Sequence, residues 1–434
     1  MAGALRRALG AAAFMALTLV AATQAAAPEV HLSITKGFGE KVTIAVPLFR
    51  GTAGAAAPAD MRSVLSSDLR YSGYFNVVEN LAFVDDVEAD DRRTGRVQFR
   101  EWLALGAEVL VRGDVAVRGE DLVLEAQVFD LGAGRSIFSR RYASQPAQWR
   151  ATVHELADDI VRHLTGERGI ARTKIAFVSN VTGTKEIYVM DYDGENGRRL
   201  TKDGLAALYP SWFGDNSAVA YTRFRNSGQE GVAIDVRTGV VRRLTSFPGL
   251  NAFISVSPKG NELAMTLSRD GNPEIYRLRS DGSEPRRLTY GSSTESSPCW
   301  SPDGRRLAFV SDRSGSPQIY VMSAAGGSEE RLTYQGSYNT SPSWSPKGDL
   351  IAYTARVEGV YQICTVDVDT KKVVQLTTGA GNKEDPSWAP DGRHIVYSVR
   401  SKGKTDLYVL DIHDLTQVRL TSGAGDHESP AWLH

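Results

Sequence analysis

Cysteine is scarce in this chain, which has two, Cys299 and Cys364, among 434 residues. The net charge is also close to zero, because 50 lysines and arginines balance 51 aspartates and glutamates. Nucleic-acid binding normally needs a concentrated basic surface, so this balance argues against nucleic acid as the main partner. What is present, 42% hydrophobic and 23% charged residues, is typical of a folded, soluble protein with large cores. The length suits two or three domains.

Long apolar runs are missing after the first 27 residues. Arg6 and Arg7 precede an apolar run from Ala8 to Ala22, which small residues follow. This order is typical of a secretory signal peptide. The run is short for a retained membrane anchor, which needs about 20 apolar residues. We therefore expect residues 1–27 to be a signal peptide cleaved between Ala25 and Ala27, and the mature protein to be exported without direct membrane insertion.

Motifs for catalysis and for metal or cofactor binding are also missing. No serine stands in a Gly-x-Ser-x-Gly motif, and residues 37–42 lack the third glycine of a dinucleotide-binding loop. The segment HELAD, residues 154–158, starts like a zinc-protease helix, but Asp158 stands where the second histidine belongs. We expect this segment to be an exposed helix face. The sequence predicts no catalytic residue, no metal site and no cofactor.

A triplet, Arg-Leu-Thr, recurs every 44 residues in the second part of the chain. Its six copies, one of them Gln-Leu-Thr, end at Thr201, Thr245, Thr289, Thr333, Thr377 and Thr421. Tryptophans keep the same register at Trp212, Trp300, Trp344, Trp388 and Trp432. A repeat of this length, built from short strands, is typical of a β-propeller.

Each copy divides into four short strands separated by turns. The proline of the first strand, such as Pro298, suits an edge that faces a central channel, because proline lacks a backbone donor. The tryptophan that follows should act as a wedge between neighbouring blades. The first copy begins at Lys174 without this strand, whereas the chain ends on it. We therefore expect a six-bladed propeller over residues 174–434, closed by a C-terminal strand at 429–433.

Residues 28–167 lack this period and predict a separate, smaller α/β domain. Residues 41–49 read as a buried strand, and residues 58–73 as a helix ending at Gly73. A second helix is expected near residues 97–106, and then a hairpin and a further strand. An amphipathic helix stopped by Gly166 closes the domain, and residues 168–173 form a linker.

The predicted fold separates the two cysteines. Cys299 falls in the innermost strand of the fourth blade and Cys364 in the third strand of the fifth. Strands lie about 4.8 Å apart, so two strand steps and a change of blade exceed the reach of a disulfide. We expect two buried free thiols.

Two surfaces are candidates for binding a partner. The first is the set of loops that lead from each Arg-Leu-Thr triplet to the next innermost strand. These loops carry Tyr209, Leu250, Asn251, Thr294, Glu295, Tyr338, Asn339, Glu384, Asp385 and Glu428. Their acidic residues could equally form a solvated rim. The second is the start of the mature chain, where Val30, Leu32 and Ile34 alternate with polar residues; this strand could pair within its own domain or add to a partner's sheet.

The order of parts resembles one family. A signal peptide, a small domain starting EVHLSITKG and six blades with SPDG, IYVM and RLT segments are similar to TolB proteins, periplasmic components of the Tol–Pal system of Gram-negative bacteria. The resemblance covers the whole mature chain. The blade motif alone is shared with other propellers, including those of prolyl peptidases.

The resemblance implies protein binding without catalysis, for envelope integrity and for drawing the outer membrane inward at cell division. The lipoprotein Pal of the peptidoglycan-associated envelope complex should sit on the loops named above, from Leu250 to Glu428, and the protein should be a monomer. TolA of the inner-membrane complex should meet the start of the mature chain. That segment consists of Glu29, Val30, His31, Leu32, Ser33, Ile34 and Thr35. The alternative is an exported propeller hydrolase or lyase that uses acids lining the channel.

Overall fold

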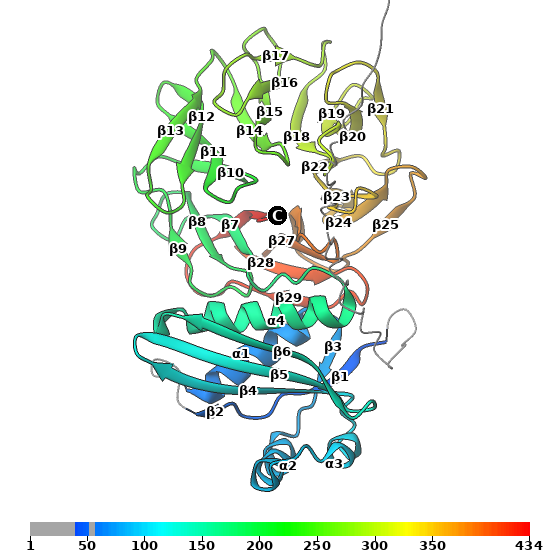
Figure 1. Ribbon diagram of the computed structural model, residues 1–434. Coiled ribbons are helices and arrows are strands. Elements are labelled where there is room, and N and C mark those ends of the chain that lie inside the picture. The colour runs from blue at the N-terminus through cyan, green and yellow to red at the C-terminus, as the bar shows by residue number, and fades with distance from the viewer. Residues whose placement is uncertain (1–39, 52–56) are drawn as a thin grey trace, which may run out of the picture.

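A computed structural model describes residues 40–51 and 57–434, which form a small α/β domain beside a six-bladed β-propeller (Figure 1). The fold class therefore matches the one expected from the sequence. The expected signal peptide and the segment from Glu29 to Thr35 lie outside the described residues. No helix in the described part of the chain has the length and apolar character needed to cross a bilayer.

The N-terminal domain is built on a mixed sheet in the order β3-β1-β4-β5-β6, with β2 paired to β4. β1 runs parallel to β3 and β4, whereas β4, β5 and β6 are antiparallel. Its strands are β1 (Val42–Ala45), β2 (Arg50–Gly51), β3 (Phe75–Val77), β4 (Val109–Arg118), β5 (Asp121–Asp130) and β6 (Arg135–Ser144). Its helices are α1 (Pro58–Tyr71), α2 (Leu81–Thr94), α3 (Phe99–Ala104) and α4 (Trp149–Thr165).

Helices α1 and α4 pack side by side on one face of this sheet (Figure 1). Leu65 of α1 and Leu156 of α4 are fully buried in the same cluster as Leu124 of the sheet. Gly166 ends α4 with φ of 75°, a left-handed conformation that glycine adopts without steric cost. The apolar spacing of these helices is what made them predictable.

Helix α2 was not predicted, because its segment is rich in charge and has no continuous apolar face. Polar contacts hold it instead. Asp91 is 1% exposed and accepts a hydrogen bond of 2.7 Å from the indole N–H of Trp102. Arg112 also binds this carboxylate and pairs with the buried Glu88 at 2.7 Å.

The propeller contains six four-stranded antiparallel sheets, which we number as blades 1 to 6. Blade 1 comprises β30 (His427–Trp432), β7 (Lys174–Ser179), β8 (Glu186–Asp191) and β9 (Arg198–Arg199). Blade 2 comprises β10 (Ala207–Trp212), β11 (Ala218–Arg225), β12 (Gly228–Asp235) and β13 (Val241–Thr245), and blade 3 β14 (Asn251–Val256), β15 (Glu262–Leu267), β16 (Glu274–Arg279) and β17 (Arg286–Arg287). Blade 4 comprises β18 (Glu295–Trp300), β19 (Arg306–Ser311), β20 (Gln318–Ser323) and β21 (Glu329–Arg331), and blade 5 β22 (Asn339–Trp344), β23 (Leu350–Val357), β24 (Val360–Asp367) and β25 (Val373–Gln375). Blade 6 comprises β26 (Asn382–Trp388), β27 (His394–Ser401), β28 (Lys404–Asp411) and β29 (Gln417–Arg419).

The ring closes through blade 1, which takes its innermost strand from the end of the chain. β30 pairs antiparallel with β7, and Trp432 lies opposite Ile175. The indole N–H of Trp432 donates to Thr173 Oγ1 at 2.7 Å, and the ring is 2% exposed. This is the pairing expected from the sequence.

The repeated residues have repeated roles. In every blade the threonine of the triplet accepts a hydrogen bond from the backbone of the third strand, as Thr289 Oγ1 does from the Ile275 N–H at 2.9 Å. The tryptophan packs between blades, and the indole N–H of Trp300 reaches the Ser255 carbonyl of the preceding blade at 3.1 Å. The 44-residue period therefore records contacts that each blade makes with itself and with its neighbour.

The two cysteines are free. Cys299 lies in β18 of blade 4 and Cys364 in β24 of blade 5, as the blade assignment predicts. Cys364 is buried, but Cys299 is only half-buried, which corrects the expectation for that residue. Burial raises the pKa of the Cys299 thiol to about 12 and that of Cys364 to about 11, so both stay protonated and unreactive at neutral pH.

We predict that Trp432→Ala lowers the free energy of unfolding by about 3–5 kcal/mol, because it leaves a cavity at the closing strand. Urea denaturation followed by tryptophan fluorescence and circular dichroism measures the loss. The exposed Leu415 gives a matched control, since Leu415→Ala should change stability by less than about 0.5 kcal/mol. Equal stability of the two variants would show that the closing strand does not hold the ring.

Candidate functional site

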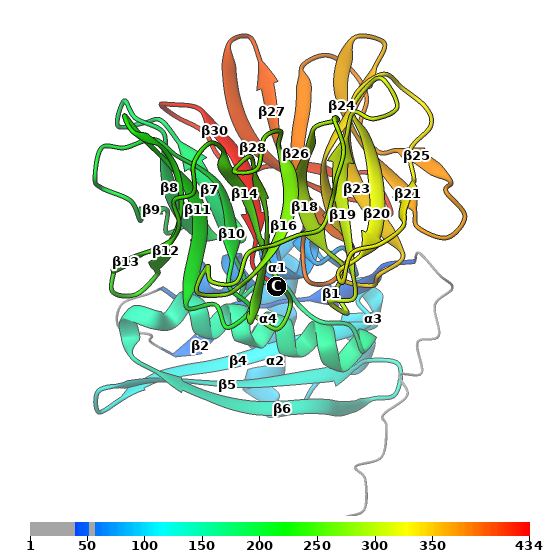
Figure 2. The same cartoon turned by 90° about the horizontal axis from the view of Figure 1, so that it is seen from above.

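The propeller has two unlike faces. We call loop face the side that carries the segments leading from each outermost strand to the next innermost strand, and turn face the opposite side. The N-terminal domain packs on the turn face at blades 1 and 6 (Figure 2). Arg393, in a turn of blade 6, donates to the Gly73 carbonyl at 2.9 Å, and Lys41 binds Asp414 at 2.9 Å. Within the described part of the chain, the loop face therefore has no domain covering it.

The interdomain contact includes a buried polar cluster that corrects the expectation for HELAD. Asp68 of α1 binds His154 Nδ1 at 2.7 Å and the Tyr192 hydroxyl of the propeller at 2.5 Å. His154 and Asp158 are 4% and 7% exposed, so this side of α4 is buried, not solvated. Asp158 accepts the Ala171 N–H at 2.8 Å and thereby anchors the linker. The second domain covers a face that looks exposed when the helix is considered alone.

Three side chains in this cluster could together offer ligands to a metal ion, namely Asp68, His154 and Asp193, whose donor atoms lie within 4.8 Å of one another. Their hydrogen bonds argue for another role. Tyr192 and His154 occupy the two oxygens of Asp68, and Arg150 pairs with Asp193. A guanidinium on the same carboxylate opposes cation binding, so the cluster fits a fixed interdomain contact.

The mouth of the central channel on the loop face is lined by one residue from each innermost strand. Tyr209, Phe253, Ser297, Ser341, Asp385 and Ser429 occupy this register, each with a positive φ of 48–58°. All six are left-handed although none is glycine, and the ladder shifts register at each of them. Together with the residues that follow them they line a cavity of about 160 Å³.

The channel mouth is chemically uneven. On one side the rings of Tyr209 and Phe253 pack against each other at a tilt, with centroids 4.3 Å apart. On the other side Asp385 accepts hydrogen bonds from Ser341 at 2.9 Å and from Ser429 at 3.1 Å. Burial raises the pKa of the Asp385 carboxyl, although the two serine hydroxyls oppose this. The mouth therefore offers an aromatic wall and a carboxyl group that is already engaged.

The structure divides the predicted loop-face residues by exposure. Tyr338 and Thr294 are exposed, and Tyr338 is 38% exposed beside Tyr361. The half-buried residues are Tyr209, Leu250, Glu384, Asp385 and Glu428. Glu428 pairs with Lys185, and burial with the nearby Asp385 raises the pKa of Glu384.

The other three predicted residues, Asn251, Glu295 and Asn339, are 0% exposed, so they cannot contact a partner on this surface. They hold the loops from below. Asn251 Nδ2 donates to the Phe247 carbonyl at 2.6 Å, and Asn339 Nδ2 donates to the Gln335 carbonyl at 2.8 Å. The sequence contained a signal for this role, because all three occupy one register of the 44-residue repeat.

Two family models match the chain. The one described as TolB beta propeller domain covers residues 161–434, and the one described as TolB amino-terminal domain covers residues 30–137. The chain belongs to the TolB family.

Individual TolB proteins support this assignment. The Tol-Pal system protein TolB of Desulfosudis oleivorans is 35% identical over 60% of this chain and 60% of its own length. The Protein TolB homolog of Chlorobium chlorochromatii is 35% identical over 63% and 62%. These alignments thus span less than two thirds of either relative. The crystal structure of TolB from Acinetobacter baumannii matches with a TM-score of 0.81 and 28% identity, covering 93% of this chain and 99% of that one.

For the interdomain cluster, we predict that Asp68→Ala lowers the free energy of unfolding by about 2–4 kcal/mol, because it leaves His154 and Tyr192 without their buried partner. Asp90 is an exposed aspartate of the same domain, and Asp90→Ala should cost less than about 1 kcal/mol. Calorimetry gives the stability of both variants. Faster proteolysis of the linker in Asp68→Ala alone would show the loosened contact; equal rates would contradict it.

Proposed function

We propose that this TolB-family protein is a non-catalytic periplasmic component of the Tol–Pal system. Its loop face holds the outer-membrane lipoprotein Pal, and residues 29–35 engage TolA of the inner-membrane complex. The observation that carries the proposal is the difference between the two faces. The N-terminal domain packs on the turn face, whereas no domain in the described structure covers the loop face. Family membership supplies the biological context.

The loop face has the chemistry of a protein-binding surface. Aromatic side chains dominate the energetics of most interfaces. Here Tyr209 and Phe253 line the channel mouth, and Tyr338 is exposed on the same face beside Tyr361. Half-buried acids such as Glu384 and Glu428 lie on the same face and can accept hydrogen bonds from a partner. Strands and buried amides hold the loops, so little ordering should be needed on binding.

The alternative, a propeller hydrolase or lyase, needs a free acid or nucleophile in the channel. Two groups that could serve at the channel are engaged or unreactive. Asp385 accepts two serine hydroxyls, and the thiol of Cys299 has a raised pKa. Turnover of peptides or glycans by the purified protein would favour the enzyme, and capture of a lipoprotein from solubilised envelopes favours the scaffold.

We further propose that the two binding regions are coupled. In the sequence, five residues, 36–40, separate the segment 29–35 from Lys41, which binds Asp414 of blade 6. The state of the N-terminal segment can therefore bias the propeller through the interdomain contact.

We predict that Tyr338→Ala weakens Pal binding about tenfold, because an exposed aromatic anchor is lost. Isothermal titration calorimetry with the soluble domain of Pal measures the affinity. Val240 is 66% exposed on the turn face, and Val240→Ala should leave the affinity unchanged. If both variants bind like the original protein, Pal does not use this part of the loop face.

We also predict that deletion of residues 28–35 abolishes TolA binding and changes the affinity for Pal. Pull-downs with TolA and titrations with Pal test the two effects separately. Retained TolA binding would exclude the segment as the contact, whereas an unchanged Pal affinity would remove only the coupling.

A further inference from the structure

Neighbouring blades meet under the loop face through a buried pair of residues in one register of the repeat. One member lies at or near the start of the third strand of a blade. The other comes 21 residues later, in the innermost strand of the following blade. The six pairs are Glu186 and Ala207, Glu230 and Asn251, Glu274 and Glu295, Gln318 and Asn339, Gln362 and Lys383, and Asp406 and His427. All twelve residues are at most 9% exposed. Of the six junctions, the one between blades 3 and 4 alone brings two carboxyl groups together.

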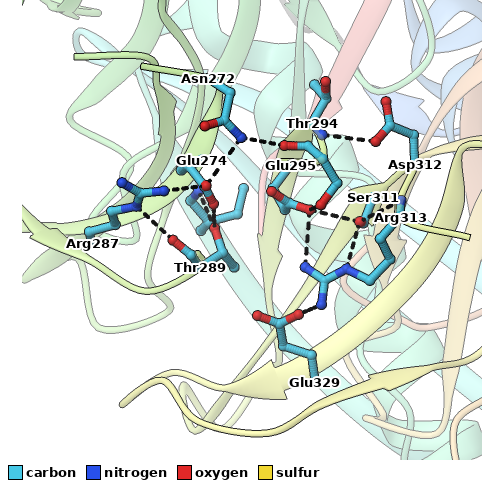
Figure 3. A network of polar contacts seen from close by, with 12 residues as sticks. Asn272, Glu274, Arg287, Thr289, Thr294, Glu295, Ser311, Asp312, Arg313 and Glu329 are labelled. Carbon is cyan, nitrogen blue, oxygen red and sulfur yellow. Dashed lines mark hydrogen bonds and ion pairs between the residues drawn. The ribbon is translucent and has the colours of Figure 1, made fainter. Parts of the chain in front are cut away.

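Figure 3 shows the polar contacts around this acid pair. Glu274 accepts the Thr289 hydroxyl at 2.6 Å and pairs with Arg287. One oxygen of Glu295, Oε1, accepts the Ser311 hydroxyl at 2.8 Å and Arg313 at 3.0 Å. The other oxygen, Oε2, is buried and has no hydrogen-bond partner. A buried acceptor without a donor is costly, so this atom marks the place where a hydrogen is required.

The charges around the pair also indicate that a hydrogen is required here. Three carboxylates, Glu274, Glu295 and Glu329, face two guanidinium groups, Arg287 and Arg313. Asp312 accepts the Thr294 N–H at 2.8 Å (Figure 3), and Asp270, which is paired with Arg269, lies near Arg287. The three glutamates and two arginines together carry one negative charge in excess, and the two carboxyl groups at the centre, Glu274 and Glu295, are fully buried, where an excess charge is unfavourable. One proton removes it.

The next junction shows the neutral form of the same contact. Between blades 4 and 5, Asn339 Nδ2 donates to Gln318 Oε1 at 2.8 Å, so a single N–H joins the two side chains. Glu274 and Glu295 occupy the equivalent positions with four oxygens and no N–H. Asn339 is equivalent to Glu295 and Gln318 to Glu274, so one hydrogen between the two glutamates would restore a single bond of this kind. Its direction is reversed here, because the atom without a donor is Oε2 of Glu295.

We propose that Glu274 and Glu295 hold one proton between them, donated by Glu274 to Glu295 Oε2, and that this proton fixes the loop of residues 291–295 on the loop face. The loop depends on the pair directly, since Ser293 Oγ donates to Glu295 at 2.7 Å and Asn272 holds the Ser293 carbonyl. Thr294, an exposed residue of the candidate docking surface, lies on this loop.

The direction of the pH response follows from the proton. Burial raises the pKa of Glu274, and the charge of Glu295 raises it further, against the bonds from Thr289 and Arg287. A carboxyl group with a raised pKa in the folded state stabilises it fully below the unfolded value, near 4.5 for glutamate, and loses that contribution as pH rises through the folded pKa. The blade 3–blade 4 junction, and with it the loop, should loosen as the solution becomes more alkaline.

Glu274→Gln tests the proposal in the free full-length protein, because glutamine keeps an N–H donor for Glu295 and cannot titrate. In infrared spectra at about pH 6, the intensity from protonated carboxyl groups should be lower in Glu274→Gln than in the original protein by the amount of one group. Hydrogen-exchange protection of amides 293–296 should fall about tenfold from about pH 5 to about pH 8 in the original protein, and less than about twofold in the variant. Glu230→Gln is the matched control: it changes the buried acid at the equivalent position of blade 2, which pairs with Arg223 and whose register partner, Asn251, is not an acid. It should keep both signals of the original protein.

If Glu274→Gln does not fold, Glu295→Gln carries the same test, because loss of either carboxyl group removes the shared proton. A protonated-carboxyl intensity that neither variant lowers, or a pH response that persists in the variant, would overturn the proposal. The test uses no partner protein, so its outcome is independent of whether Pal binds the loop face.

Discussion

Closure of the ring by the last strand is the constraint on which the rest of the structure depends. Five blades are continuous in the sequence, but blade 1 exists only when β30 reaches β7. Before β30 pairs with β7, the other three strands of blade 1 lack their innermost neighbour, and the side of blade 6 that faces blade 1 has no complete blade beside it. Because Trp432 lies where β30 meets both the linker and the N-terminal domain, the same contact that completes the ring also places the second domain.

This placement gives the propeller its polarity. The turn face is used internally, through Arg393, Lys41 and the cluster around Asp68, and these contacts are polar and directional. Apolar packing alone would allow the domains to slide, whereas buried hydrogen bonds between named atoms favour one orientation. The loop face remains for partners, which is the arrangement expected of a rigid interaction module.

The repeat and its closure were readable from the sequence because they rest on local chemistry that recurs: a proline, a tryptophan and a threonine at fixed spacing. The docking residues were less predictable. Asn251, Glu295 and Asn339 looked like loop residues, yet they are fully buried. Their common register in the repeat marks them as equivalent, but spacing alone does not show which side of an innermost strand faces the neighbouring blade. The prediction that the HELAD segment is an exposed helix face was wrong for a related reason. A helix face can be classified as exposed only when every domain that packs on it is known. Helix α2 lacked an apolar period, since Asp91 and Glu88 take the place of a hydrophobic face.

The six left-handed residues at the channel mouth have a consequence for how such a protein can diverge. Each costs about 1 kcal/mol of backbone strain that the blade already tolerates, whatever its side chain. Tyrosine, phenylalanine, serine and aspartate all occupy this position here without altering the strand. Substitutions at these sites can therefore change what the mouth recognises while the blades stay as they are, so partner choice can evolve almost separately from architecture.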